Sequence, residues 1–216
     1  MRQRAFDLPV RTGFSSADFL VSECNREAFE LIERWPDWPS PALVLHGPSG
    51  SGKTHLAHLW CERAGAALIS GKAVDAAALP DATALAIDDA EQAQEEPLLH
   101  LYNSALERGA SLLLTLPGPP ASMLIALPDL ASRLRALPVA GIAPPDDAVL
   151  GAVLLKHFAD RQIVVRPGVI AYLIAHIERS FAAAASVAAQ LDEAALAAAR
   201  PITIKLAREV LGASGL

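Results

Sequence analysis

The sequence predicts an α/β fold built on a parallel sheet, followed by a small all-helical subdomain. Three observations predict this class. A glycine-rich motif stands between an apolar strand and a helix, apolar strands and helices alternate through the first two thirds of the chain, and only helical patterns follow residues 144–145. The 216 residues suffice for one full domain with a small appendage. We expect residues 13–144 to form the α/β subdomain and residues 145–216 the helical one.

The first predicted elements frame the motif. Residues 1–12 include a proline and show no helical period, which predicts an extended arm. Residues 24–34 carry apolar side chains on one helical face, and residues 35–41 form a turn because three prolines in six residues cannot continue a helix. The apolar run 42–46 is typical of a buried strand, and residues 55–60 have helical spacing.

The remaining elements alternate in the same way. We expect strands over residues 66–70, 84–87, 111–115 and 138–141, the last at a sheet edge, and helices over 95–108 and 128–134. This alternation favours a parallel sheet with helices on both faces, an αβα sandwich. Beyond residue 145 we expect helices over 146–161, 167–177, 179–199 and 203–212. The alanine-rich tract 182–199 favours a helix packed closely on its neighbours.

Composition excludes several classes of protein. Hydrophobic residues make up 52% of the chain and charged residues 19%, which is typical of a globular protein. The net charge of −6 and the scattered basic residues argue against sequence-specific DNA binding as the main activity. No apolar run reaches 18 residues and no secretion signal begins the chain, so we expect a cytoplasmic protein without a membrane span. Cys24 and Cys61 give neither a disulfide framework nor a metal-binding spacing.

Residues 47–54 match the phosphate-loop pattern G-x-x-x-x-G-K-[ST] without a mismatch. Backbone N–H groups of such a turn, together with the following helix N-terminus, surround phosphate oxygens. Lys53 is expected to reach the β- and γ-phosphates, and the Thr54 hydroxyl to bind Mg²⁺. The expected nucleotide-binding residues here are Gly47, Pro48, Ser49, Gly50, Ser51, Gly52, Lys53, Thr54 and His55.

Polar residues at the ends of two later strands extend this site. Asp88 has the Walker B position and is expected to hold Mg²⁺ through water. Asp89 stands where related ATPases often carry a glutamate base; its shorter side chain predicts slow hydrolysis. Thr115 could contact the γ-phosphate or the attacking water, or could simply end a buried strand.

Spacing alone leaves the roles of two arginines undecided. Arg133, on the short helix 128–134, could reach the nucleotide of a neighbouring subunit, or it could be a solvated side chain. Arg179, at the start of the helix 179–199, could reach from the helical subdomain over the phosphates.

At this point the chain resembles the AAA+ core of the replication initiator DnaA, and most closely the short DnaA-related regulators of the Hda type. Residues 18–26 resemble the opening motif F-x-V-x-x-x-N, which implies that Leu20, Val21 and Asn25 line an adenine pocket. Residues 85–89 resemble the family's Walker B segment. Further similar segments are residues 101–107, 127–134 and 201–211. The implied fold is a P-loop AAA+ αβα sandwich followed by a helical lid.

The resemblance also implies residue roles. Arg133 matches the arginine finger, which acts in trans, and Arg179 matches the sensor 2 arginine, although residues 180–182 depart from the initiator's pattern. Residues 3–9 resemble the peptide by which Hda proteins bind the DNA polymerase sliding clamp. In that peptide Gln3 would make polar contacts, and Phe6 and Leu8 would fill an apolar pocket.

The implied function is that of a regulator. Bound to ADP or ATP with Mg²⁺, the protein would dock on the sliding clamp and stimulate hydrolysis of DnaA-bound ATP. The chain ends at Leu216, where the initiator continues into a DNA-binding domain, so we expect a nucleotide switch without a DNA reader. A finger acting in trans is compatible with a homodimer or a head-to-tail oligomer. The alternatives are a small P-loop ATPase or metabolite kinase and a helicase-loader-like adaptor.

Overall fold

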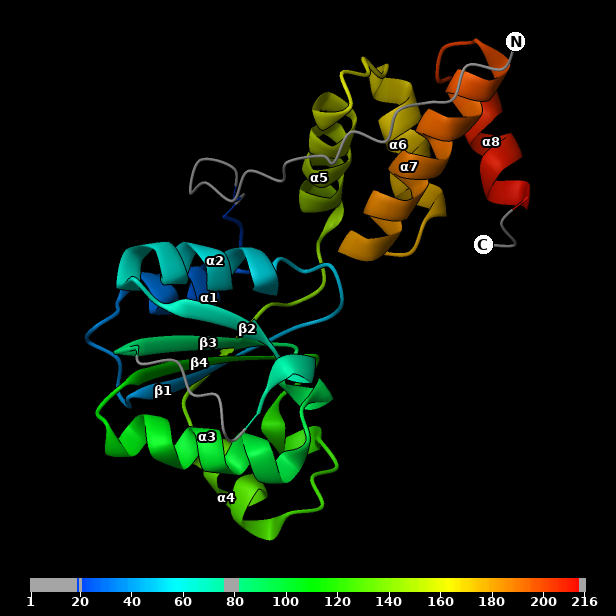
Figure 1. Cartoon of the computed structure of the whole chain (residues 1–216). Helices are drawn as coiled ribbons and strands as arrows, with labels where there is room; N and C mark the ends of the chain where they lie inside the picture. The colour runs from blue at the N-terminus through cyan, green and yellow to red at the C-terminus, as the bar shows by residue number, and fades with distance from the viewer. Residues whose placement is uncertain (1–18, 20, 76–81, 214–216) are drawn as a thin grey trace, which may run out of the picture.

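A parallel sheet and a separate helix bundle make up the molecule (Figure 1). The computed structural model describes residues 19, 21–75 and 82–213. Five strands form the sheet in the order β2-β3-β4-β1-β5, and every neighbouring pair is parallel. The strands are β1 (Ala42–His46), β2 (Ala67–Ser70), β3 (Ala84–Asp88), β4 (Ser111–Leu116) and β5 (Val139–Gly141). Because all strands run the same way, their carboxyl ends meet at one edge of the sheet.

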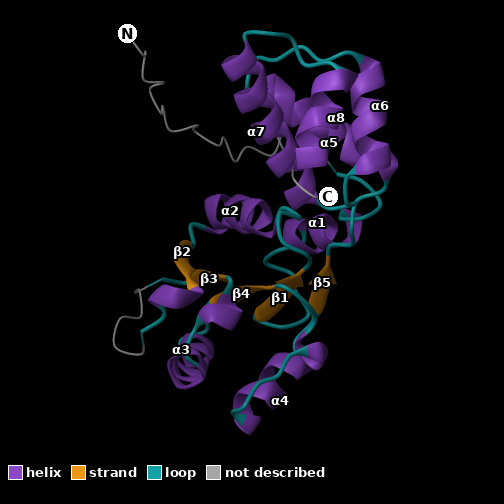
Figure 2. Cartoon of the chain, turned by 90° about the vertical axis from the view of Figure 1, so that its right-hand side faces the viewer, coloured by secondary structure: helices purple, strands orange, loops and turns teal. Residues whose placement is uncertain are grey.

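Helices cover both faces of the sheet. Figure 2 shows α1 and α2 on the face toward the bundle, and α3 and α4 on the opposite face. These helices are α1 (Arg26–Glu33), α2 (Lys53–Ala64), α3 (Glu95–Glu107) and α4 (Pro128–Ala136). In the described part of the chain, short 3₁₀ turns lie between them: η2 (Gly71–Ala73), η3 (Ala90–Gln92) and η4 (Pro120–Ser122).

The sequence of β1 explains why the sheet is buried on both sides. Leu43 and Leu45 pack in the core beneath α1 and α2, whereas Ala42 and Val44 pack in the core beneath α3 and α4. Successive side chains of a strand point to opposite faces, so a strand that is apolar throughout requires two covering layers. Trp60 of α2 is fully buried in the first of these cores and stacks on Trp38, 5.2 Å between ring centroids.

The helix bundle has its own core. It consists of α5 (Asp147–Asp160), α6 (Pro167–His176), α7 (Phe181–Ala198) and α8 (Ile204–Ala213). Asp146 caps α5 by accepting a hydrogen bond from the Val149 amide at 2.8 Å. Within the alanine-rich tract, Ala184 and Ala188 are fully buried against the other bundle helices. Small side chains at these positions let α7 pack closely, as the sequence predicts.

The predicted elements are present, most with ends shifted by one or two residues; the helix expected over 55–60 is longer and ends four residues later, at Ala64. The helix predicted over 24–34 is shorter at both ends, β4 extends one residue beyond the predicted strand, and α4 extends two residues beyond residue 134. The strand over 138–141 lies at a sheet edge, as expected. The arm of residues 1–12 lies outside the described residues. Among the described residues, no helix has the length and apolarity needed to cross a bilayer.

Candidate functional site

The phosphate loop joins β1 to α2 at the carboxyl edge of the sheet. Gly50 and Gly52 have φ angles of +72° and +94°, a region that glycine enters without strain. A Cβ atom on Gly47 would lie 2.9 Å from the Ile142 carbonyl oxygen, so this position has no room for a side chain. The strand, turn and helix that the motif requires are therefore present at the predicted residues.

Lys53, the first residue of α2, is buried with its ammonium group inside the loop. Its Nζ donates hydrogen bonds to the carbonyl oxygens of Gly47 at 2.8 Å and Pro48 at 3.0 Å. Burial lowers the pKa of Lys53 from its ordinary value, and the nearby carboxylates of Asp89 and Asp88 oppose that shift. The loop therefore concentrates positive charge and amide donors at one point.

Three side chains and one backbone amide form what we call the Asp88 cluster. Asp88 ends β3, and its two carboxylate oxygens accept from the Thr54 hydroxyl at 2.8 Å and the Thr115 hydroxyl at 2.6 Å. The Thr115 oxygen in turn accepts from the Asp89 amide at 2.8 Å. Strands β1 and β3 both neighbour β4, which brings the phosphate loop, Asp88 and Thr115 together. The sequence predicts Thr54, Asp88 and Thr115 for one site, and in the structure Asp88 contacts both threonines.

Asp89 follows in the left-handed backbone region, with φ of 51°. Gly71, at the start of η2, allows this conformation, because a Cβ there would collide with the Asp89 carbonyl oxygen. Sequence reasoning missed Gly71. A glycine directly after a predicted strand was the available signal, but only the fold shows what approaches it.

Aromatic rings stand over the start of α2. The ring of Phe19 lies 3.1 Å from the position of a Cβ on Gly52, and it packs edge-on against His55 at 5.3 Å between centroids. Phe19 also stacks on Phe29 of α1 at 5.8 Å. Of the predicted adenine-pocket residues, Asn25 is buried and accepts from the Ser22 amide at 2.8 Å, and Val21 is partly exposed. Leu20 lies outside the described residues, as do Gln3, Phe6 and Leu8 of the arm.

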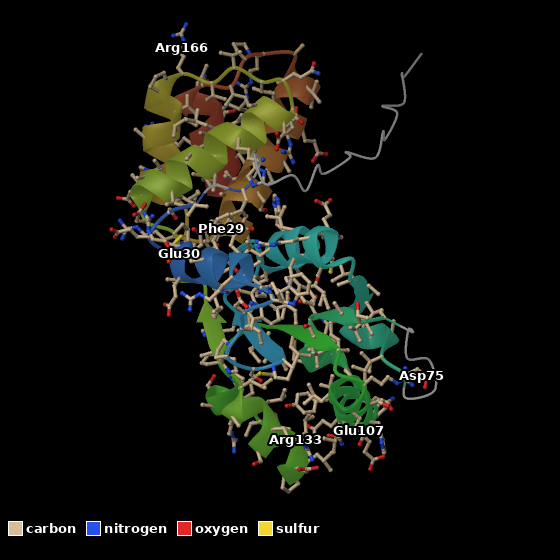
Figure 3. The ribbon with its side chains drawn as sticks, turned by 90° about the vertical axis from the view of Figure 1, so that its left-hand side faces the viewer. Phe29, Glu30, Asp75, Glu107, Arg133 and Arg166 are labelled. Atoms are coloured by element: carbon tan, nitrogen blue, oxygen red, sulfur yellow. The ribbon has the colours of Figure 1, made fainter. Side chains whose placement is uncertain are left out.

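Arg133 lies on α4, on the face of the sheet opposite α2 (Figure 3). Its guanidinium pairs with Asp129 one turn earlier at 3.1 Å and stands 5.9 Å from the ring centre of Tyr102 on α3. The Arg133 side chain is 40% exposed. Glu95, at the start of α3, accepts from the amides of Ala126 and Leu127 and so fixes the chain that leads into α4. The guanidinium is thus held outward on a fixed helix.

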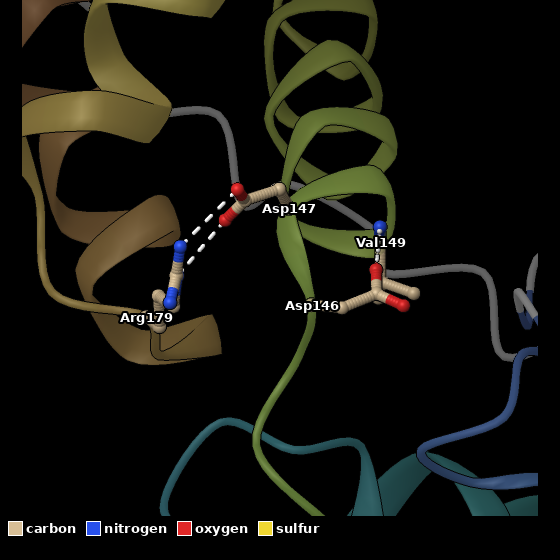
Figure 4. Close-up of polar contacts among 4 residues, drawn as sticks. All are labelled: Asp146, Asp147, Val149 and Arg179. Atoms are coloured by element: carbon tan, nitrogen blue, oxygen red, sulfur yellow. Dashed lines mark hydrogen bonds and ion pairs between the residues drawn. The ribbon is translucent and has the colours of Figure 1, made fainter.

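Arg179 corrects one detail of the sequence prediction. The long helix begins at Phe181 rather than at Arg179, because the Ser180 hydroxyl caps it by accepting from the Ala183 amide at 3.0 Å. The Arg179 guanidinium makes a two-pronged ion pair with Asp147 of α5, at 2.9 and 3.2 Å (Figure 4). Asp147 was not singled out from the sequence, since the two residues are 32 positions apart.

The residues present fit a nucleotide with Mg²⁺. Ser51 Oγ is buried within the loop and has no hydrogen-bond partner among the described residues, which is what a donor awaiting a phosphate oxygen requires. Thr54 and Asp88 supply the oxygen ligands that Mg²⁺ prefers. The described part of the chain has no cluster of three histidine, cysteine or acidic residues, and a P-loop site needs none because phosphates complete the Mg²⁺ shell.

The two cysteines take no part in this chemistry. Cys24 and Cys61 are both free thiols in the described structure. Burial, with a smaller contribution from Asp88, raises the pKa of Cys61 to about 11, so this thiol stays protonated and unreactive at neutral pH.

Comparisons with known proteins concern the fold and the lid. Residues 147–211 match the family model described as "Hda, lid domain". The whole chain resembles domain III of the Thermotoga maritima replication initiation protein DnaA, with a TM-score of 0.76, 16% identity and coverage of 95% of this chain and 98% of that domain. It also resembles the Thermotoga maritima RuvB branch migration motor, with a TM-score of 0.71, 14% identity and coverage of 92% and 71%.

A third match is AMPPCP-bound DnaA from Aquifex aeolicus, with a TM-score of 0.61, 19% identity and coverage of 75% of this chain and 60% of that one. The chain thus spans an entire DnaA domain III but about three fifths of the longer initiator structure. These likenesses confirm the predicted fold, an AAA+ α/β sandwich with a helical lid.

Proposed function

We propose that the chain is an Hda-type, DnaA-related AAA+ protein that acts as a nucleotide-bound activator of ATP hydrolysis on DnaA. The match of residues 147–211 to the Hda lid domain and the DnaA-like fold support this proposal. The match of the lid residues to the Hda family supports the coarser role, that of a DnaA-related replication regulator. The finer role, in which this chain completes the catalytic site of another protein and thereby prevents re-initiation, is our proposal.

The observation that carries the proposal is the placement of Arg133. It stands on α4, across the sheet from the helix that begins at the chain's own phosphate loop, and its side chain is substantially exposed. Asp129 and the Tyr102 ring hold the guanidinium without enclosing it. An arginine presented to a partner's γ-phosphate stabilises the charge that develops in phosphoryl transfer.

The chain's own nucleotide site has a structural role in this proposal. Lys53 and the loop amides would hold the phosphates of ADP or ATP, and Thr54 with Asp88 would hold Mg²⁺. When bound, Mg²⁺ neutralises phosphate charge. Asp89 is the candidate base, but its carboxylate is one methylene shorter than the glutamate common in such ATPases, which supports weak intrinsic hydrolysis. We further propose residues 13–144 as the nucleotide-binding subdomain and 145–216 as the lid.

The test is turnover of DnaA-bound ATP in the presence of clamp-loaded DNA and this protein. Arg133→Ala is expected to lower the stimulated rate by about 10³-fold, since an arginine finger contributes 10³–10⁵ in rate. Arg135→Ala removes an exposed cation two residues away on the same helix and is the matched control, expected to retain stimulation. Equal activity of both variants would reject the finger assignment.

Docking on the sliding clamp is a second part of the proposal, and it depends on the arm. Residues 3–9 carry a glutamine followed by two apolar anchors, the pattern of a clamp-binding peptide. Capture of the full chain by immobilised clamp should be lost when Gln3 and Phe6 are both replaced by alanine. Capture that persists after both replacements would reject the role of the arm.

A further inference from the structure

The ion pair between Arg179 and Asp147 joins two ends of the lid. Asp147 is the first residue of α5, and Arg179 stands two residues before α7. Both Nε and one terminal nitrogen of the guanidinium donate to the two carboxylate oxygens, at 2.9 and 3.2 Å. This arrangement uses the planar fork of arginine fully, so a guanidinium held here cannot address a phosphate in the same way.

Both partners lie close to chain segments that touch the phosphate loop. A Cβ on Gly50 would lie 2.8 Å from the Ala182 amide nitrogen, so the start of α7 abuts the loop. Arg179 is three residues from Ala182, and at most about 10 Å of extended chain separates their Cα atoms. On the other side, Ile142 contacts Gly47 and leads through residues 143–146 to Asp147. Each partner therefore lies within five residues of a segment that approaches the phosphate loop.

The pair is weak enough to exchange. The two side chains are 65% and 56% exposed, and exposed ion pairs contribute little to stability because water screens them. Shallow hollows of about 670 Å³ and 470 Å³ border Arg179, the first against α6 and the second against residues 144–148. The guanidinium thus has room to turn away from Asp147 without displacing buried side chains.

We infer that Asp147 is a positioning residue that competes with the nucleotide's terminal phosphate for Arg179, and so sets the preference of this chain between ATP and ADP. The inference rests on the nucleotide binding proposed above. While Asp147 holds the guanidinium, the additional phosphate of ATP gains less from Arg179. Removing the charge of Asp147 frees the guanidinium for the more anionic ligand, and therefore raises affinity for ATP more than affinity for ADP.

The test is calorimetric titration of the full chain with ATP and with ADP, each with Mg²⁺. Asp147→Asn should raise ATP affinity by about threefold to fivefold, which at 1.4 kcal/mol per tenfold is about 0.7–1.0 kcal/mol, the size of an exposed pair. ADP affinity should change less than about twofold. Asp147→Glu, which keeps the charge, should retain the original ratio of the two affinities.

Asp146→Asn is the matched control. It removes the same charge one residue earlier and keeps a residue suited to capping α5, and Asp146 makes no ion pair with Arg179 in the described structure. It should leave the ATP-to-ADP ratio unchanged. In the Arg179→Ala background, Asp147→Asn should lose its effect, because the residue through which it acts is gone.

Two results would overturn the inference. One is an equal ATP-to-ADP ratio in Asp147→Asn and Asp146→Asn, and the other is an effect of Asp147→Asn that persists without Arg179. If Asp147→Asn binds both nucleotides with the same ratio of ATP affinity to ADP affinity as the unaltered chain, this inference is rejected and the proposed function stands. A chain that binds neither nucleotide overturns both. Thermal unfolding of each variant identifies any change that comes from loss of folding.

Discussion

Replacing Thr115 by valine would test whether the Asp88 cluster is a structural unit as well as a candidate ligand site. Thr115 is the second-last residue of β4, and 0% of its surface is exposed. Its hydroxyl donates to Asp88 at 2.6 Å and accepts from the Asp89 amide at 2.8 Å. Valine has nearly the same shape and fills the same space, but it can make neither hydrogen bond.

The expected cost follows from these two contacts. A hydrogen bond to a charged group contributes about 1.5–3 kcal/mol, and an amide left without a partner costs about 1–3 kcal/mol. The two terms share one hydroxyl and Asp88 remains partly solvated, so we expect Thr115→Val to lower the free energy of unfolding by about 2–4 kcal/mol. At about 2–4 °C per kcal/mol for a chain of this size, a loss of about 3 kcal/mol lowers the melting temperature by about 6–12 °C.

The assay is urea denaturation followed by tryptophan fluorescence. All three tryptophans, Trp35, Trp38 and Trp60, lie in the core beneath α1 and α2, so the signal reports on the sheet subdomain. Thr115→Ser is the control: it keeps the hydroxyl, loses one buried methyl group and should cost about 1 kcal/mol. If valine proves as stable as serine at this position, the hydroxyl contacts do not stabilise the fold and the reasoning fails.

Two more perturbations have matched tests. Gly50→Ala should destabilise the chain and make the linker at residues 143–146 more sensitive to limited proteolysis, because the new Cβ would meet Ala182. The control is Gly109→Ala: Gly109 has φ of +69° and no neighbour within 4 Å, so this variant should show only the backbone cost of about 1–2 kcal/mol. Equal cleavage of the linker in the two variants would contradict the clash. Burial and the charge of Arg161 lower the pKa of His157 below its usual 6.5, so the unfolded chain binds this proton more readily than the folded chain does. The free energy of unfolding should therefore be highest above about pH 6.5 and should decrease as the pH falls below that value. In His157→Gln, the free energy of unfolding, followed by circular dichroism, should fall less between about pH 7.5 and pH 5.5 than it does in the unaltered chain. An equal fall in both proteins would refute the linkage.

Local sequence signals predicted the elements and the phosphate loop well. A strand, a glycine-rich turn and a helix follow one another along the chain, so the pattern that encodes them lies within a dozen residues. Sheet order is a different kind of information. That β4 lies between β3 and β1 depends on pairings between distant segments, and apolar runs such as those of β1 and β4 are too alike to specify their neighbours.

Within the candidate site, the same distinction separates what was predicted from what was missed. Asp88 and Thr115 each lie near the carboxyl end of an apolar strand, and the rule that parallel strands end at one edge brings them together. No comparable rule predicts from the sequence that Asp147 and Arg179 meet. Each is a charged residue near a helix start, and only the packing of α5 beside α7 shows that they meet. The clash that makes Gly71 necessary is likewise a long-range contact.

The hydrogen bonds from the amides of residues 126 and 127 to Glu95 have a consequence for which sequence changes this protein can tolerate. Its carboxylate holds main-chain amides, and every amino acid except proline offers the same amide. The exposed side chain at position 126 can therefore vary without loosening the helix that carries Arg133, whereas Leu127 also packs against the core. Glu95 itself has less latitude, because glutamine offers one acceptor oxygen in place of two and aspartate is one methylene shorter.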